Sequence, residues 1–142
     1  MQALTFLPLA APTRLALPLY LSPVAAGFPS PAEDYIDRKL DLNEQLIRNP
    51  ASTFFVRVDG DSMRDASIAS GDILVVDRSL APRNNAIAIA AINGELTVKR
   101  LKKVLSRLWL VPENPEFPPI EIVPEMQFEI WGVVTYIIHK AV

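Results

Sequence analysis

The feature that most constrains the fold is a series of short apolar segments separated by residues that favour tight turns. Asn93-Gly94 lies between alternating segments at 86–92 and 95–101, and this dipeptide is the strongest short-range signal for a β-hairpin. One short helix is predicted after Asp41, a suitable N-cap, with Pro50 marking a stop beyond it. Further strands are predicted at 53–59, 72–77, 107–111 and 126–139, the last bent at Gly132. Short strands with little helix predict a mostly β fold, either a sandwich or a partly open barrel.

Composition narrows the chemistry that such a fold can carry. The 142 residues make up about one domain, which can bury a core without disulfides or metals. The chain has no cysteine and one histidine, His139, which excludes thiol nucleophiles and thiolate metal sites and argues against a Ser-His-Asp triad. A net charge of −2 and a pI near 5.4 argue against a generic nucleic-acid surface. We therefore expect no metal and no cofactor.

Charge and proline are distributed unevenly along the chain. Residues 1–32 contain a single charged side chain, Arg14, and six of the 13 prolines, whereas residues 33–142 contain 16 acidic and 13 basic residues. The sequence therefore predicts two parts. These are a proline-rich apolar N-terminal arm over 1–32 and a β-rich domain over 33–142.

The arm has three interpretations. Val24-Ala25-Ala26 places small residues where a signal peptidase cuts, but no Lys or Arg precedes the apolar stretch and its prolines would break a helix. No apolar run reaches the roughly 20 residues that span a bilayer, so no membrane segment is expected. The arm is otherwise an inert extended leader, or an extended segment that docks on the protein itself and that proline stiffens in advance. Composition leaves these interpretations open.

Gly60-Asp61-Ser62-Met63 directly follows the predicted strand at 53–59. A serine after a strand and a glycine turn can project its hydroxyl and present neighbouring N–H groups as an oxyanion hole. The same residues are also typical of a turn serine or of a helix N-cap in the polar stretch up to Ser70. A nucleophilic serine needs a base, and His139, at the end of the last predicted strand, is expected to face solvent or to act as a capping residue.

Lys99 is the candidate base. Serine–lysine pairs act when burial lowers the pKa of the lysine by several units. Alternation along 95–101 places Lys99 and Thr97 on the same face of a strand, which buries Lys99 if that face meets the core. Alternatively, Lys99 belongs to a solvated basic edge that protects the strand from aggregation, together with the basic residues at 100, 102 and 103.

These motifs occur together in an order that is typical of one family. The chain resembles the LexA/UmuD family of self-cleaving Ser–Lys peptidases in the serine motif and in Ala26-Gly27-Phe28-Pro29-Ser30-Pro31, Ser70-Gly71-Asp72, Thr97-Val98-Lys99-Arg100-Leu101 and Trp131-Gly132-Val133-Val134. The likeness covers about residues 24–138. It implies the fold of the LexA/UmuD C-terminal domain, with short, partly antiparallel strands and one or two short helices.

The resemblance also implies roles for particular residues. Ser62 matches the nucleophile and Lys99 the general base, while the backbone N–H groups of Asp61 and Ser62 would form the oxyanion hole. Ala26-Gly27 matches the bond that is cut. The chain departs from the family at Asn85-Ala86, where the family usually has Gly followed by Asp or Ser. Because asparagine tolerates a positive φ, we expect this turn to be kept.

A UmuD-like member of this family would be a cytoplasmic homodimer of the SOS response to DNA damage. Its cleavage would be stimulated by a RecA filament on single-stranded DNA, and the processed form would join a UmuC-like Y-family polymerase in translesion synthesis. The 26 residues before the cut are too few for a DNA-reading domain, so no sequence-specific DNA binding is expected. The alternatives are a signal-peptidase-like Ser–Lys protease and a non-catalytic polymerase accessory subunit.

Overall fold

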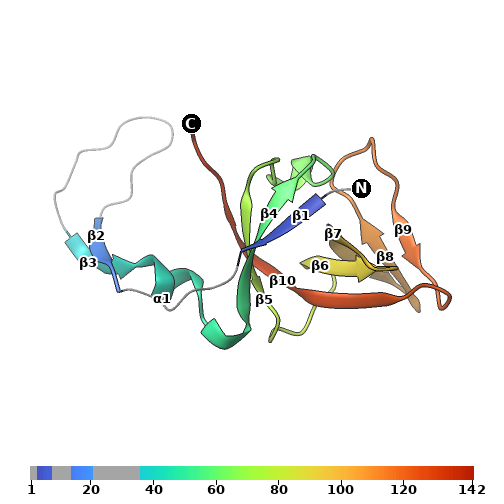
Figure 1. The fold of residues 1–142 in the computed structure, drawn as a ribbon, viewed down its shortest axis with the longest axis horizontal. Helices are drawn as coiled ribbons and strands as arrows, with labels where there is room; N and C mark the ends of the chain where they lie inside the picture. Colours follow the sequence, from blue (N-terminus) through green and yellow to red (C-terminus); the bar gives the residue numbers. More distant parts are fainter. Residues whose placement is uncertain (1–2, 8–13, 21–35) are drawn as a thin grey trace. The chain divides into compact units, whose positions relative to one another are not determined.

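The computed structural model describes residues 3–7, 14–20 and 36–142, which fall into two units. The larger unit contains residues 3–7 and 49–142, and the remaining described residues belong to the smaller one. Strands make up most of the regular structure in both, and every strand pair is antiparallel (Figure 1). The predicted mostly β fold is therefore confirmed.

The described part of the larger unit is built around an eight-stranded sheet with the order β1-β4-β5-β10-β6-β7-β8-β9. The strands are β1 (Ala3–Leu7), β4 (Thr53–Asp59), β5 (Ile73–Asp77), β6 (Ile87–Ile92), β7 (Glu95–Val104), β8 (Arg107–Val111), β9 (Ile120–Ile122) and β10 (Phe128–Ile138). The 3-10 turns η1 (Pro50–Ser52) and η2 (Arg64–Ala66) lie on either side of β4. All the strands predicted from the sequence are present, whereas β1 and β9 were not predicted as strands.

The β6–β7 hairpin follows from its turn and from its alternation. Asn93 and Gly94 have φ values of 51° and 84°, as a two-residue hairpin turn requires. Along β6, Ala88 and Ala90 pack into one hydrophobic cluster and Ile89 into another. Successive side chains of a strand point to opposite faces, so this part of the sheet has a buried core on each face.

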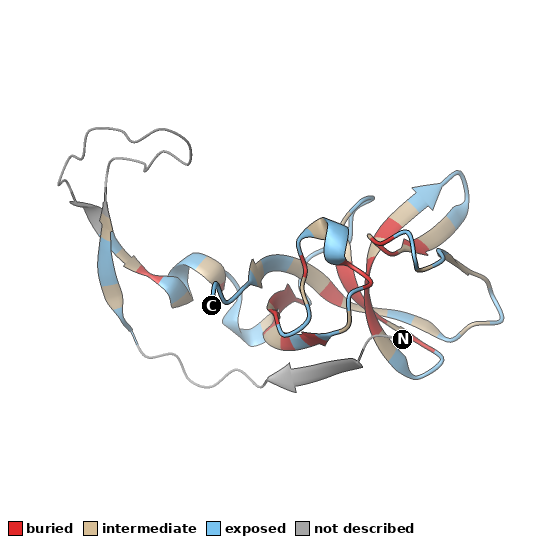
Figure 2. Ribbon diagram, turned by 90° about the horizontal axis from the view of Figure 1, so that it is seen from above, coloured by how far each residue is buried: buried red, intermediate tan, exposed pale blue. Residues whose placement is uncertain are grey.

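The larger of the two clusters lies between β4, β5, β6, β7 and the loop after β4. Figure 2 shows the buried residues of the described chain in red. Each fully buried aliphatic side chain stabilises the fold by about 1.5–3 kcal/mol relative to its exposure. The buried members are Val56, Val58, Met63, Ile68, Leu74, Val76, Ile89 and Val98.

Strand β10 joins the two halves of the sheet. Its first part, Phe128 to Val133, pairs with β6, and its second part, Val133 to Ile138, pairs with β5. The register shifts between Ile130 and Gly132, which agrees with the predicted bend. A Cβ atom at Gly132 would lie 2.7 Å from Val76 Cγ1 and 3.1 Å from the Asp77 carbonyl oxygen, so glycine allows β10 to lie this close to its neighbour β5.

The smaller unit contains β2 (Ala16–Tyr20), which pairs with β3 (Ile36–Asp41), and the helix α1 (Leu42–Leu46). Asp41 caps α1 as predicted, because its Oδ1 accepts a 3.0 Å hydrogen bond from the Asn43 N–H. The predicted boundary at residue 32 lies outside the described residues and stays a prediction. No helix in the part of the chain that is described is long and apolar enough to cross a membrane.

Candidate active site

Ser62 lies in the loop that leaves β4, and this loop is anchored on both sides of the serine. Gly60 takes a positive φ of 113° and its N–H donates to Ser70 Oγ at 3.2 Å. Met63 is fully buried in the larger cluster. Ser62 itself is 2% exposed, and Met63 rather than Ser62 occupies the N-cap position of η2. Of the two non-catalytic interpretations, the helix N-cap is therefore wrong, and Ser62 is a buried residue of the turn.

Lys99 lies in β7, which pairs with β6 on one side and β8 on the other. Its side chain is on the face of Ala88, its partner in β6, and the residue is 6% exposed. The interpretation of Lys99 as part of a solvated basic edge is therefore wrong. The basic neighbours at 102 and 103 do not indicate an exposed Lys99, because β7 is exposed only at its two ends, at Glu95 and from Lys103 onward.

The structure brings Ser62 and Lys99 together. Lys99 Nζ lies 3.1 Å from Ser62 Oγ, 2.7 Å from Thr97 Oγ1 and 3.0 Å from the Val98 carbonyl oxygen. None of the ion pairs found among the described residues involves Lys99. Among the described residues, the amine therefore has polar neighbours but no carboxylate within ion-pair distance.

Burial lowers the pKa of Lys99 from 10.5 to about 8, because an ammonium ion loses hydration inside the protein. With that pKa roughly a tenth of the molecules carry a neutral amine at pH 7, compared with about one in three thousand for an exposed lysine. A neutral amine 3.1 Å from a hydroxyl can accept its proton. This is the arrangement that activates a serine without histidine.

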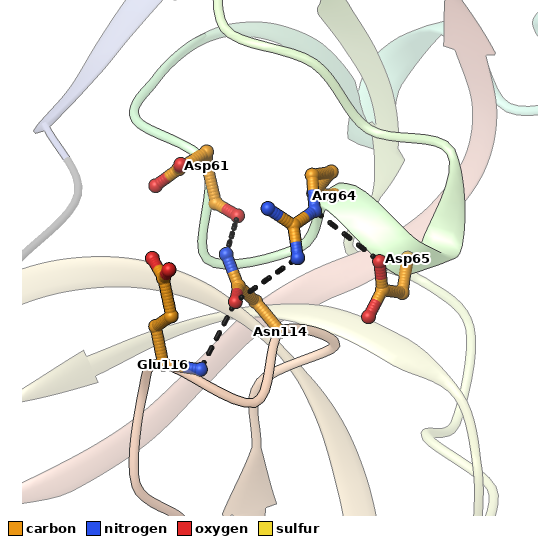
Figure 3. Close-up of polar contacts among 5 residues, drawn as sticks. All are labelled: Asp61, Arg64, Asp65, Asn114 and Glu116. Carbon is orange, nitrogen blue, oxygen red and sulfur yellow. Dashed lines mark hydrogen bonds and ion pairs between the residues drawn. The ribbon is translucent and has the colours of Figure 1, made fainter.

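Asp61, which precedes the serine, is held in place by hydrogen bonds to its backbone carbonyl. The Asp61 oxygen accepts hydrogen bonds from Asn114 Nδ2 at 2.9 Å and from the Arg64 N–H at 3.1 Å. Figure 3 shows the Asn114 side chain reaching from the loop after β8 toward this carbonyl. Asn114 was not singled out from the sequence, since an asparagine between prolines in a loop carries no local signal of such a contact. The oxyanion-hole role of the Asp61 and Ser62 N–H groups stays a prediction.

The other residues predicted from the sequence are the cleavage site, His139 and the turn at Asn85. Ala26 and Gly27 lie outside the described residues. His139 has a side chain that is 61% exposed, with Nδ1 2.6 Å from Asp72 Oδ1, so it faces solvent as predicted and lies against a buried carboxylate. Asn85 has a φ of 73°, and its N–H donates to the Leu101 carbonyl at 2.8 Å. The turn at Asn85-Ala86 is therefore kept, as predicted.

Metal ligands are not gathered in this part of the protein. Within residues 3–7, 14–20 and 36–142, no group of three or more His, Asp or Glu residues is arranged to hold an ion. The candidate site consists of a hydroxyl, an amine and backbone amides.

Comparison with known proteins shows the family of this chain. A family model described as Peptidase S24-like matches residues 18–135, most of the chain. The chain belongs to the Peptidase S24-like family. Protein SamA of Salmonella typhimurium (strain LT2) is 48% identical over 129 residues, which cover 91% of this chain and 89% of SamA. Protein MucA of Escherichia coli is 48% identical over 122 residues, covering 85% of this chain and 83% of MucA.

A longer relative is also similar to this S24-like chain. The LexA repressor of Bordetella avium (strain 197N) is 41% identical over 131 residues, which cover 92% of this chain and 61% of the repressor. The resemblance to the LexA/UmuD family that the motifs indicated is thereby confirmed. Membership of a peptidase family agrees with the predicted kind of enzyme, a serine peptidase.

Proposed function

We propose that this protein cleaves its own chain between Ala26 and Gly27, with Ser62 as nucleophile and Lys99 as general base. The observation that carries the proposal is the 3.1 Å approach of Lys99 Nζ to Ser62 Oγ in a buried setting that lowers the pKa of the lysine to about 8. Membership of the S24-like family supports the same reaction class.

The reaction conserves protons and electrons. Neutral Lys99 takes the proton of the Ser62 hydroxyl, and Ser62 Oγ forms a bond to the Ala26 carbonyl carbon. The resulting oxyanion is stabilised by the N–H groups of Asp61 and Ser62. When the Ala26–Gly27 bond breaks, the Lys99 ammonium returns the proton to the Gly27 nitrogen. Water then hydrolyses the ester at Ser62, which leaves a carboxyl group on Ala26 and regenerates the hydroxyl.

Tethering lowers the activation barrier of such a reaction. The cleaved bond belongs to the enzyme, so no bimolecular encounter has to be made, and effective molarity can remove roughly 7–11 kcal/mol of the barrier when the geometry is productive. Each chain turns over once. The rate is then controlled by whether the cleavage segment docks next to Ser62.

Mass spectrometry of the purified protein after incubation at pH 7 to 10 tests the proposal. We expect two fragments, residues 1–26 and residues 27–142, in the wild type and neither in Ser62→Ala or Lys99→Ala. An intact wild-type mass, even with RecA, ATP and single-stranded DNA present, would contradict self-cleavage and favour a non-catalytic accessory subunit. Cleavage of the purified Ser62→Ala protein would indicate an external protease.

The biological setting belongs to the same proposal. We infer a cytoplasmic homodimer of the SOS response, cleaved faster in the presence of a RecA filament on single-stranded DNA, whose processed form binds a UmuC-like Y-family polymerase during translesion synthesis. The similarity to a LexA repressor and to SamA and MucA supports this setting. A cleavage rate that is the same with and without RecA filaments would contradict it.

The signal-peptidase-like alternative differs in its substrate. Such an enzyme cleaves other proteins, whereas the proposed reaction consumes the chain that contains Ser62. The two functions are distinguished by adding the wild type to an excess of a short peptide that spans residues 20–32. Cleavage of many peptide molecules per enzyme molecule would favour the signal-peptidase-like alternative.

A further inference from the structure

Asn114 is a buried polar residue whose side chain spans two loops. It is 3% exposed and lies in the loop between β8 and β9. Its Oδ1 accepts from the Glu116 N–H at 3.0 Å and from Arg64 Nη2 at 3.5 Å. Both of these groups are donors, so the oxygen of the amide must face them and the NH2 group must face the Asp61 carbonyl. The orientation of the amide is therefore fixed by its surroundings (Figure 3).

The Asp61 carbonyl that Asn114 contacts belongs to the same peptide group as the Ser62 N–H. A trans peptide group is planar, and its C=O and N–H point in opposite directions. Two donors, Asn114 Nδ2 at 2.9 Å and the Arg64 N–H at 3.1 Å, hold the carbonyl end of this plane. Their contacts therefore set the direction of the Ser62 N–H at the other end.

We propose that Asn114 is a positioning residue that aims and polarises the Ser62 N–H toward the oxyanion. The proposal rests on the function proposed above. A donor at a peptide carbonyl draws electron density from the adjoining N–H, because hydrogen bonds in a chain polarise one another. Asn114 thus makes the Ser62 N–H a stronger donor as well as a better directed one, without touching the reacting atoms.

The loop that contains Asn114 is also held in place by contacts that do not involve the Asn114 side chain. The carbonyl oxygen of the preceding residue, Glu113, accepts from the Asp65 N–H at 2.7 Å. The Glu113 side chain pairs with Arg100, which follows Lys99 in β7. The loop therefore stays attached to η2 and to β7 when the Asn114 amide is removed. The change takes away the hydrogen bond to the Asp61 carbonyl, together with those that Oδ1 accepts from Glu116 and Arg64 on the side away from it.

The first test is the rate of self-cleavage of Asn114→Ala as a function of pH. Removal of a direct oxyanion donor lowers a rate about 100- to 1000-fold. For a residue that acts on the oxyanion donor only indirectly, we expect the plateau rate to fall roughly 10- to 100-fold. The midpoint of the pH profile should not change, since the surroundings of Lys99 are intact. Asn49→Ala is the matched control, because it removes an amide that donates to Asp77 at 2.9 Å in another part of the unit. A plateau rate equal to that of the wild type, or an equal fall in the control, would overturn the proposal.

The second test does not require cleavage. In a Lys99→Ala background, where no cleavage is expected, the Asn114→Ala change should move the carbonyl 13C resonance of Asp61 and the amide resonances of Ser62. Unchanged resonances would overturn the proposal. If they move while the wild-type protein remains intact in the mass assay, the contact is upheld and the proposed self-cleavage is contradicted, so the two failures are distinguishable.

Discussion

Lys99 shows how a single residue acquires its chemistry from its place in the sheet. Its ammonium form is disfavoured because β6 and β8 flank its strand and remove water, not because a positive neighbour repels it. The hydroxyl of Thr97 and the carbonyl of Val98 accept from Nζ and keep it near Ser62. The position of the amine and its pKa therefore have the same structural origin.

The pH dependence of cleavage follows from that pKa. In the proposed reaction the reactive form of Lys99 is the neutral amine, so the rate should rise about tenfold per pH unit below pH 8 and level off above it. With an unshifted lysine the rise would continue to about pH 10.5. Single-turnover rates measured from pH 6 to 11 test this expectation. Lys103→Ala, at an exposed position of the same strand, should keep the wild-type profile, and a rate still rising steeply at pH 10 would contradict the assignment.

The same pKa predicts a change in stability. The folded state holds Lys99 with a pKa of about 8 instead of 10.5, so between these values the unfolded chain binds more protons and stability rises with pH. Each pKa unit corresponds to about 1.4 kcal/mol. In a Ser62→Ala background, the free energy of unfolding relative to a Lys99→Met variant should increase by up to about 3 kcal/mol from pH 7 to pH 11. If urea denaturation gives the same pH dependence for the two proteins, the pKa of Lys99 is not lowered in the folded state.

Among the structural elements, η1 is tied to the end of β5 through Asp77. Burial alone would raise the pKa of this carboxyl, but hydrogen bonds from Asn49, Ser79 and Ser52 outweigh it and lower the pKa from 3.8 to about 2. The charged carboxylate thus holds the turn before β4 against the strand that pairs with it. This contribution is complete above pH 4 and is lost as the pH falls toward 2.

An Asp77→Asn variant tests the network. It should be less stable than the wild type at pH 6, and the difference should shrink as the pH falls from 4 to 2, where the wild-type carboxyl becomes protonated. Urea unfolding at each pH gives the comparison, with Asp65→Asn as the exposed control. A difference that stays constant through this range would mean that the charge of Asp77 contributes nothing to the fold.

Two glycines should respond differently to alanine because their constraints differ. Gly94 has a positive φ and open space around its Cβ position, whereas Gly132 would place a Cβ 3.1 Å from the Asp77 carbonyl oxygen and closer still to Val76. We expect Gly94→Ala to cost about 1 kcal/mol, and Gly94→Asn less, since asparagine tolerates this conformation. Gly132→Ala should cost about 3 kcal/mol because backbone must move. Equal losses in urea denaturation would contradict the close approach of β10 to β5.

The positions of the strands along the chain were more predictable than the order in which the strands pair in the sheet. Residues 53–59 form a strand with the predicted bounds, and Asn93-Gly94 makes the predicted turn, since alternation and turn chemistry are local. The insertion of β10 between β5 and β6 is a pairing between distant segments, and no local pattern encodes it. The burial of Lys99 depends on that sheet, and Asn114 contacts a residue far from it in sequence. Motif order identified Ser62 and Lys99, but only the fold brings Asn114 to the site.

At the scale of the whole molecule, the sheet includes a strand from the N-terminal segment. The backbone of β1 pairs with β4 from Ala3 opposite Asp59 to Leu7 opposite Phe55, and β4 pairs on its other side with β5. β4 is therefore an inner strand of the described sheet. A cut at Ala26–Gly27 leaves β1 attached to the larger unit only through non-covalent contacts.

Hydrogen exchange tests what cleavage does to this strand. Alternate amides of β4, those that face β1, should exchange faster in a chain that begins at Gly27 than in full-length Ser62→Ala, while the amides between β7 and β8 should exchange equally in both. Equal protection throughout β4 would show that β1 contributes no protection there.

The β1–β4 pairing gives the proposed reaction a physical product besides two fragments. Once the short piece dissociates, one row of backbone donors and acceptors along β4 loses its partners, and the shortened chain exposes the edge of β4 that β1 covers in the intact chain. Such edges pair readily with an extended segment of another chain. Hydrolysis of one peptide bond would thereby replace β1 with an exposed edge of β4 at this end of the sheet, where a strand from a partner could take the place of β1.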